Sequence, residues 1–414
     1  MPLYSYSKFQ YPHTNFLKIQ TSNFISEHAA LYLTHVFKSF SVSLLGVFLP
    51  IYIYNLALSS AHFSSNTLLN GISWILLYFF LRSFVALISM VFFVNILFGK
   101  LGFQRALILS VFLLALQLLC LKYASISIIY VIFAGILGGL EVTFYWVPYH
   151  IYFVRKMGGK SHKYGAQMGT RRFLVHTLTS ISPFLGGLII STFNFDILFV
   201  ISLLLLLTSC IPLILSLTDT KHHYHHISSI FLSYLFNKKY YYSTIAYLGE
   251  GIESLVYTVF WPLLLFVILS NYLAIGTLHT ISLFISGFVI LFVGKYIDSH
   301  SIYKLHRVGI YTNSVFHLLR LLITSAPFAY LLDISDRLNS GMFAVPTMAL
   351  LYEKAQRNNS SEYILYREFA IHLAIAVTAI LLGIFIVATG YWRWVFTIGA
   401  LASLLVLSIH FDSN

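Results

Sequence analysis

The stretch YREFAIHL at residues 366–373 places Arg367, Glu368 and His372 beside a long apolar run. The earlier stretch TRRFLVHT at residues 170–177 repeats the same spacing of arginine, phenylalanine and histidine. Further matches follow in the same order: Pro50 in GVFLPIYIY with Pro262 in TVFWPLLLF, the loop 95–105 with the loop 294–304, and Val147-Pro148 with Val345-Pro346. Because the matches keep one order along the chain, they predict two similar halves.

The composition is that of a membrane protein. Of 414 residues, 58% are hydrophobic and 9% are charged, whereas soluble domains carry about 25% charged residues. Apolar runs of about 20 residues can cross a bilayer as helices. We predict about twelve spans, at 29–54, 71–97, 105–121, 125–150, 172–193, 196–217, 243–269, 273–294, 306–325, 328–351, 367–389 and 393–411. The fold class is therefore an all-α polytopic membrane protein.

The basic residues predict the orientation of the spans. Lys and Arg gather in the loops on one side, whereas only Lys122 and Arg393 fall on the other. Since cytoplasmic loops carry the excess of positive charge, we predict both termini in the cytoplasm and a location in the cytoplasmic or plasma membrane. Anionic membrane lipids account for the net charge of +12, so no nucleic-acid partner is expected.

The spans divide the chain into four parts. We predict a cytoplasmic lead-in at 1–28, a six-helix bundle at 29–217, a cytoplasmic linker at 218–242 and a second six-helix bundle at 243–414. The linker contains KHHYHH (221–226), whose imidazoles could bind a metal. No fixed spacing closes such a site, so we interpret His222–His226 as a solvated linker and predict no metal and no cofactor.

Two loop motifs resemble the major facilitator superfamily. Its loop signature is roughly G-x-L-x-D-R-x-G-R-R, and the second copy here keeps Gly294 and Asp298. The first copy keeps Leu97, Lys100, Gly102 and Arg105, but has Gly99 at the aspartate. A P-x-x-G-G tail shared by many exporters occurs at 183–187. The resemblance implies two parallel-repeat six-helix bundles around a central cavity, lined by the first, fourth, seventh and tenth spans and worked by alternating access.

Charged residues inside the spans are candidates for the site, because a charge near the bilayer centre is costly. Aligning Pro50 with Pro262 puts Lys38 and Glu250 at equal depth. Both would lie on helices that the resemblance assigns to the cavity. We therefore predict that Lys38 and Glu250 form either an ion pair that breaks during the cycle or a permanent structural pair.

Glu141 is the first choice for proton coupling. It lies in mid-span, where a desolvated carboxyl is suited to carry one proton per cycle. Tyr145, Trp146 and Tyr149 follow on the same span and would contact an apolar or cationic substrate. The alternative is a Glu141 locked by a neighbouring donor such as Arg82.

Other acidic residues lie at different depths. Glu250 and Glu253 share one helix face, where two close carboxylates favour protonation of one of them. Asp333 and Arg337 have the i, i+4 spacing of a pair that neutralises itself. The ninth span, which the resemblance assigns to the outer layer, is an exception in carrying His317 and Arg320, although Arg320 could reach outward to the interface.

The resemblance also implies a cytoplasmic gate, in which the signature aspartate meets a helix start of the opposite half. Asp298, beside Lys295, would then meet Arg171. The equivalent contact of the other half would join the first copy of the signature to Arg367, but Gly99 stands at its aspartate position. Glu368 would replace the missing contact by pairing with Lys100.

We therefore predict a monomeric secondary transporter, not an enzyme, that exports a small organic solute of unknown identity in a proton-coupled cycle. The alternatives are a lipid flippase or scramblase, or a membrane-embedded lipid-modifying enzyme. The acidic residues are spread over several spans, which argues against the tight catalytic cluster of an enzyme.

Overall fold

The structure is a computed structural model that describes residues 27–59, 67–94, 101–157, 164–216, 233–297 and 300–411. Every regular element in these ranges is a helix, as the all-α prediction requires. Nine described helical stretches are long and apolar enough to cross a membrane, and one bent pair makes a tenth. The chain is thus built as a multi-pass membrane protein.

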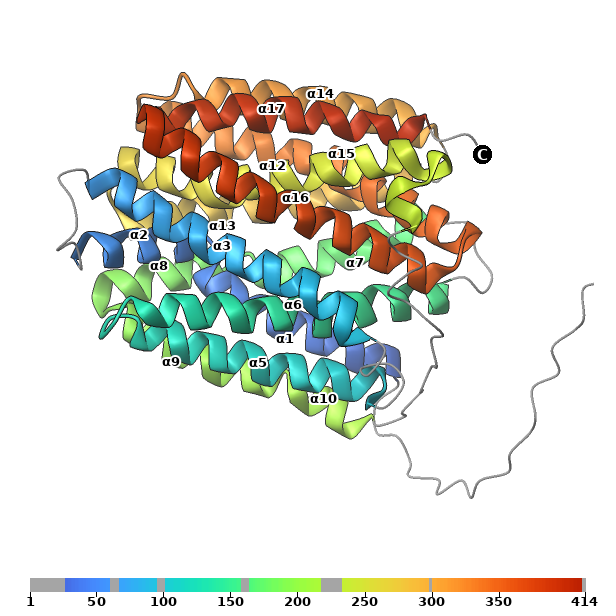
Figure 1. The fold of residues 1–414 in the computed structure, drawn as a ribbon, viewed down its shortest axis with the longest axis horizontal. Helices are drawn as coiled ribbons and strands as arrows, with labels where there is room; N and C mark the ends of the chain where they lie inside the picture. Colours follow the sequence, from blue (N-terminus) through green and yellow to red (C-terminus); the bar gives the residue numbers. More distant parts are fainter. Residues whose placement is uncertain are drawn as a thin grey trace, which may run out of the picture.

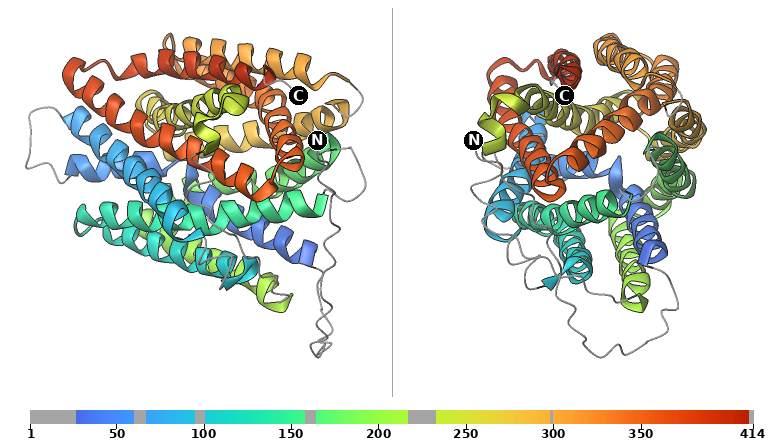
Figure 2. Two further views of the ribbon diagram at one scale, coloured as in Figure 1. Left: turned by 45° about the vertical axis from the view of Figure 1, so that its right-hand side comes forward. Right: turned by 90° about the vertical axis from the view of Figure 1, so that its right-hand side faces the viewer.

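The helices form two groups that lie side by side (Figures 1 and 2). The N-terminal half comprises α1 (Glu27–Gly46), α2 (Leu49–Ser59), α3 (Thr67–Phe92), α5 (Phe103–Tyr123), α6 (Ile129–Met157), α7 (Tyr164–Thr179), α8 (Ser182–Thr192), α9 (Phe195–Thr208) and α10 (Cys210–Leu215). The C-terminal half comprises η2 (Lys238–Tyr240), α12 (Tyr241–Leu269), α13 (Tyr272–Ile297), α14 (Ile302–Arg320), α15 (Ala326–Arg357), α16 (Ser360–Thr389), η3 (Trp392–Trp394), α17 (Val395–Leu405) and η4 (Val406–His410). Figure 1 shows that α1 begins and η4 ends at the same end of the molecule, as an even number of passes requires.

Three predicted spans of the N-terminal half are interrupted rather than continuous. The breaks fall between α1 and α2, between α7 and α8, and between α9 and α10. Pro50, Pro183 and Pro212 lie just after them. In each case the residue four positions earlier is the last residue of the preceding helix. A proline ring collides with that carbonyl and offers no N–H, so the helix ends or bends there. The α1–α2 bend is 40°.

Two long helices of the C-terminal half, α14 and α15, are less apolar than the spans around them. They carry buried charged side chains, among them Arg320, Asp333 and Asp336.

The prediction that YREFAIHL begins the eleventh helix is wrong, because α16 begins at Ser360. Arg367 therefore lies about two turns inside the helix and is only 4% exposed.

The halves meet where α3 packs against α16 and where α7 and α8 pack against α13. Glycines make the second contact possible. A Cβ on Gly169 of α7 would lie 2.7 Å from the Cα of Gly294 of α13, and one on Gly187 of α8 would collide with the Tyr272 carbonyl. The signature glycine at 294 and the last glycine of the P-x-x-G-G tail thus serve close packing between the halves.

Candidate functional site

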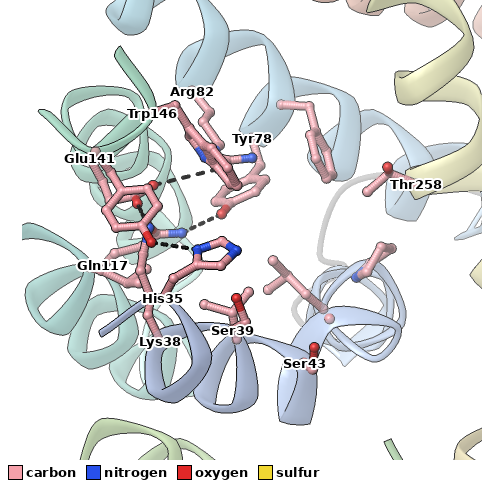
Figure 3. Close-up of a pocket in the computed structure, with 17 residues that line it drawn as sticks. His35, Lys38, Ser39, Ser43, Tyr78, Arg82, Gln117, Glu141, Trp146 and Thr258 are labelled. Carbon is pink, nitrogen blue, oxygen red and sulfur yellow. Dashed lines mark hydrogen bonds and ion pairs between the residues drawn. The ribbon is translucent and has the colours of Figure 1, made fainter. Parts of the chain in front are cut away.

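A cavity of about 310 Å³ opens among α1, α2, α3, α5 and α6. Figure 3 shows His35, Lys38, Tyr78, Arg82, Gln117 and Glu141 on one wall, where α1, α3, α5 and α6 approach one another, whereas Ser43 and Thr258 lie apart from it. The polar part is formed by His35, Lys38, Tyr78, Arg82, Gln117 and Glu141. Among the described lining residues, only Thr258 of α12 comes from the C-terminal half. The predicted cavity therefore belongs mainly to one bundle.

A buried ion pair lies at the centre of the polar wall. Lys38 Nζ donates a hydrogen bond of 2.5 Å to Glu141 Oε1, and the two side chains are 6% and 4% exposed. Arg82 Nη2 lies 3.8 Å from Glu141 Oε2, beyond hydrogen-bond distance. Lys38 therefore holds the carboxylate by a hydrogen bond, and Arg82 is a second, more distant ion-pair partner.

Aromatic rings surround the ammonium group of Lys38. Its Nζ lies 2.9 Å from the ring centroid of Tyr145 and 5.5 Å from that of Trp146. A cation over a ring face is attracted by the ring's quadrupole, more strongly when water is excluded. His35 lies 2.7 Å from the Tyr145 hydroxyl through Nδ1 and stacks on Tyr149 at 4.7 Å between centroids.

Glycines in α6 bring these groups together. A Cβ on Gly139 would collide with the Arg82 carbonyl of α3, and one on Gly138 would lie 3.0 Å from Gln117 Oε1 of α5. The run GGLE therefore lets α6 approach two helices closely, and Glu141 follows directly on that contact. Gln117 Nε2 donates to the Tyr78 hydroxyl at 2.6 Å, which joins α5 to α3 within the same polar wall.

The predicted site residues separate into different places. Glu141, Lys38, Arg82, Tyr145 and Trp146 line the cavity, and Tyr149 lies behind it against His35. The predicted pairing of Lys38 with Glu250 is wrong in this structure, because Lys38 pairs with Glu141. Equal depth in two repeats does not fix the direction in which each helix turns its side chains.

Glu250 belongs instead to a second polar cluster. It forms an ion pair with Arg367, whose Nη1 also lies 2.5 Å from Glu368 Oε1. Glu368 Oε1 is 3.8 Å from His150 Nε2 of α6, and His150 Nδ1 is 2.7 Å from the Tyr352 hydroxyl of α15. This cluster, which we call the seam cluster, connects the two halves.

Glu253, Asp333 and Asp336 lie inside the C-terminal bundle. Glu253 Oε1 is 3.0 Å from His317 Nε2 and accepts from Asn313 at 3.2 Å, so it does not act with Glu250. Asp333 has other partners besides the predicted Arg337: it accepts from Trp261 Nε1 at 2.7 Å, and its second oxygen lies 3.5 Å from His279 Nδ1.

Arg320 does not reach outward. Its Nη2 donates to Asp336 Oδ2 at 2.7 Å, and its side chain is 0% exposed. An arginine that reached the interface would expose its guanidinium. The interpretation of Arg320 as an outward-facing residue is therefore wrong.

Most of the predicted gate lies outside the described residues. The described residues do not include Asp298, Lys100 or the side chain of Arg171, so the gate contacts remain predictions. The His222–His226 run of the linker also lies outside them, so its interpretation remains a prediction as well. Lys295 is exposed at the end of α13. Arg367 and Glu368 are buried in the seam cluster rather than placed at the helix start.

Sequence reasoning missed His35, Tyr78 and Gln117 in the cavity and His150 in the seam cluster. His35 precedes Lys38 by three residues, which is one helix face, so it could have been found. Tyr78 precedes Arg82 by four residues, again on one helix face. Gln117 has no charged residue within one helical turn to indicate a role.

No protein-family model and no curated protein matches the sequence. Solved structures do match. The D-xylose–proton symporter superposes with a TM-score of 0.69 at 11% identity, covering 91% of this chain and 95% of that chain. FucP, a major facilitator superfamily transporter solved in its outward conformation, gives 0.60 at 14% identity, covering 93% and 100%.

The human organic anion transporter MFSD10 (TETRAN) gives a TM-score of 0.63 at 10% identity, covering 92% of this chain and 97% of that chain. At such identities the likeness concerns the fold. It spans nearly the whole of each protein, so both halves share it. The chain therefore adopts the fold of the major facilitator superfamily, as the repeat and the loop motifs predicted.

Proposed function

We propose that this chain is a secondary active transporter that exports a small organic solute by alternating access in a proton-coupled cycle, with both termini in the cytoplasm. One observation carries the proposal: a buried lysine–glutamate pair faces a cavity large enough for a small molecule. Buried ionisable groups in membrane helices usually mark substrate or proton pathways. The fold supports the same conclusion, because two halves of this kind can rock against each other and open a cavity to either side.

The cavity lies between two sets of contacts that join the halves. Toward the C-terminal end of α6, His150 meets Tyr352, and Val154 O accepts from Gln356 Nε2 at 3.3 Å. Toward the C-terminal end of α2, Asn55 Nδ2 donates to the Tyr272 hydroxyl at 2.8 Å. Alternating access needs such a contact on each side, because each must break while the other holds.

Glu141 is the proposed proton carrier. Its carboxylate is buried and compensated by Lys38, so a proton arriving at Glu141 removes the ion pair. Lys38 then keeps a favourable environment over the Tyr145 ring. Protonation is thereby converted into a local rearrangement of α1 against α6, the two helices that carry the pair.

Export is supported by the P-x-x-G-G tail, whose glycines pack at tight helix contacts. A Cβ on Gly186 would collide with the Leu44 carbonyl of α1, and Gly187 contacts α13 of the other half. The tail thus sits where α8 moves against both neighbours during a cycle.

The test uses proteoliposomes loaded with a deproteinised cell extract as the solute mixture. Efflux is followed by mass spectrometry with and without an imposed pH difference. We expect at least one solute to leave, and its rate to depend on the pH difference in the wild type and in Glu353→Gln, which alters an exposed carboxylate. Glu141→Gln should lose that dependence.

Unchanged pH-driven efflux in folded Glu141→Gln would show that Glu141 is not the proton carrier. Scrambling of fluorescent phospholipids in the same vesicles, without solute efflux, would favour the lipid-handling alternative.

A further inference from the structure

The charges that line the cavity do not cancel. Lys38 and Arg82 contribute two positive charges, and Glu141 is the only acidic side chain among the described lining residues. A cavity lined largely by low-dielectric groups concentrates the field of the remaining charge. The net positive charge of the lining therefore favours the binding of an anion over that of a cation.

Arg82 carries that excess. Lys38 is committed to Glu141 at 2.5 Å, whereas Arg82 reaches the carboxylate only to 3.8 Å. The Arg82 side chain is 30% exposed, and its Nε is buried without a hydrogen-bond partner. A guanidinium offers five N–H donors in a planar fork that matches an acid group with two oxygens. Arg82 thus has donors left for a ligand.

The rest of the cavity suits an apolar body. Val42, Leu49, Phe79 and Leu114 line it, together with Trp146. Figure 3 shows Arg82 and Trp146 at the same wall, so an acid group at the guanidinium places the remainder of the molecule against apolar surface. A few polar groups in an otherwise apolar pocket fix a ligand's orientation.

We propose that the cavity binds an organic monoanion, with Arg82 as the residue that selects its acid group and the apolar wall holding an aromatic or aliphatic body. The proposal rests on the proposed function, since it names the substrate class of the same cavity.

An anion at Arg82 would lie close to the Glu141 carboxylate, and two negative charges repel strongly in a low dielectric. The proposal therefore pairs the bound anion with the proton that the proposed cycle assigns to Glu141. The groups that face Glu141 are Lys38 and His35 from α1, Arg82 and Tyr78 from α3, and Tyr145 on its own helix. From α5 it meets Gln117, which does not titrate.

Anion and proton then occupy the cavity together and cross the membrane in the same direction. In the export direction, the acid leaves with a proton, and its own outward concentration gradient supplies the driving force.

The test compares three probes of similar size and fixed charge: benzenesulfonate, benzenesulfonamide and benzyltrimethylammonium, with 2-naphthalenesulfonate as a larger anion. Binding to the purified protein is measured as thermal stabilisation over a range of probe concentrations, since a ligand of the folded state raises apparent stability. We expect a sulfonate, and neither of the other probes, to stabilise the wild type.

The variants locate the binding. Arg82→Gln should weaken sulfonate binding about tenfold or more, the effect of losing a charge-assisted hydrogen bond. Arg82→Lys should recover part of it, and Lys122→Gln at the loop end of α5 should bind as the wild type does. Glu141→Gln should bind tightly at every pH.

Three results would each overturn the proposal: stronger binding of benzyltrimethylammonium, undiminished sulfonate binding in folded Arg82→Gln, or no stabilisation by either sulfonate. The outcome is separable from that of the proposed function. Arg82-dependent sulfonate binding without any pH-dependent efflux would leave the anion site standing and remove the transport cycle. Efflux of cations alone would support the transport cycle and remove the anion site.

Discussion

In the N-terminal half, Lys38, Arg82 and Glu141 face a cavity, whereas in the C-terminal half Arg320 and Asp336 lie inside the helix bundle. Both groups place charged side chains between packed helices, and each contains a buried ion pair. They differ in whether a donor remains available to an incoming molecule. Arg82 keeps 30% of its side chain exposed, and Arg320 keeps none.

The comparison shows that burial of a charge does not by itself mark a ligand site. In the C-terminal half the rings of Trp261 and Tyr257 lie 4.9 and 5.0 Å from the Arg320 guanidinium, and Asp336 completes its surroundings. Those charges hold α12, α14 and α15 together. In the N-terminal half, the same kind of pair leaves a neighbouring cation facing open space.

The largest expected effect is the loss of the C-terminal pair. Arg320→Ala leaves the buried Asp336 carboxylate without its cation, which costs about 3–5 kcal/mol of stability. We expect a large fall in the melting temperature or loss of folded protein on size-exclusion chromatography. Arg82→Ala, beside an open cavity, should change stability far less.

The double variant Arg320→Met with Asp336→Leu is the control, because it removes both charges and keeps the volume. Recovery of stability would identify the pair as structural. Equal losses in Arg320→Ala and Arg82→Ala would remove the distinction between the halves.

A smaller effect is expected at Gly139, which brings α6 close to α3. A Cβ there would lie 2.7 Å from the Val85 Cβ as well as colliding with the Arg82 carbonyl, so Gly139→Ala must push the helices apart. Overpacking of this kind costs about 1–3 kcal/mol. Thermal unfolding measures it, and sulfonate binding should fall because Arg82 and Glu141 separate.

Gly383→Ala is the matched control, since its Cβ would have no neighbour closer than 3.8 Å. Equal melting temperatures and equal binding in the two variants would show that the close approach does not position the site.

The smallest effect is expected at the seam cluster, which belongs to neither half alone. Glu368→Gln removes the charge that faces His150 across the seam, and we expect it to shift the populations of open and closed states by about 0.5–2 kcal/mol. Spin labels at Arg105→Cys and Tyr303→Cys, in a background with Cys120→Ala and Cys210→Ala, report the distance between the halves by electron spin resonance.

The distance distribution should move toward longer values in Glu368→Gln and stay unchanged in Glu362→Gln, whose carboxylate contacts Tyr234 and Asn359 within its own half. An identical response of the two variants would contradict a role for the seam cluster in joining the halves.

The fold was predictable because hydropathy and the ordered repeat act over whole spans. The breaks at Pro50, Pro183 and Pro212 were also present in the sequence, although Pro148, Pro262 and Pro346 lie inside continuous helices. Whether a proline interrupts a helix depends on how neighbouring helices satisfy the freed carbonyl. Sequence alone does not contain that information.

The site was predictable in part. Glu141 stood out because a lone carboxylate in mid-span needs compensation, and the structure places that compensation on Lys38. The repeat assigned Lys38 to Glu250 instead. An alignment fixes depth along the membrane normal but leaves the rotation of each helix about its axis open. The burial of Arg320 depends on that same rotation, which turns its guanidinium toward Asp336 instead of the interface.

The one-sided construction of the cavity bears on how the halves move. Among the described lining residues, only Thr258 belongs to the C-terminal half. A molecule bound there keeps almost all of its contacts while the halves separate on one side and close on the other. Its affinity need change little during that motion. The free-energy barrier to the motion of the two halves is then set by the contacts between helices and not by the contacts with the bound molecule.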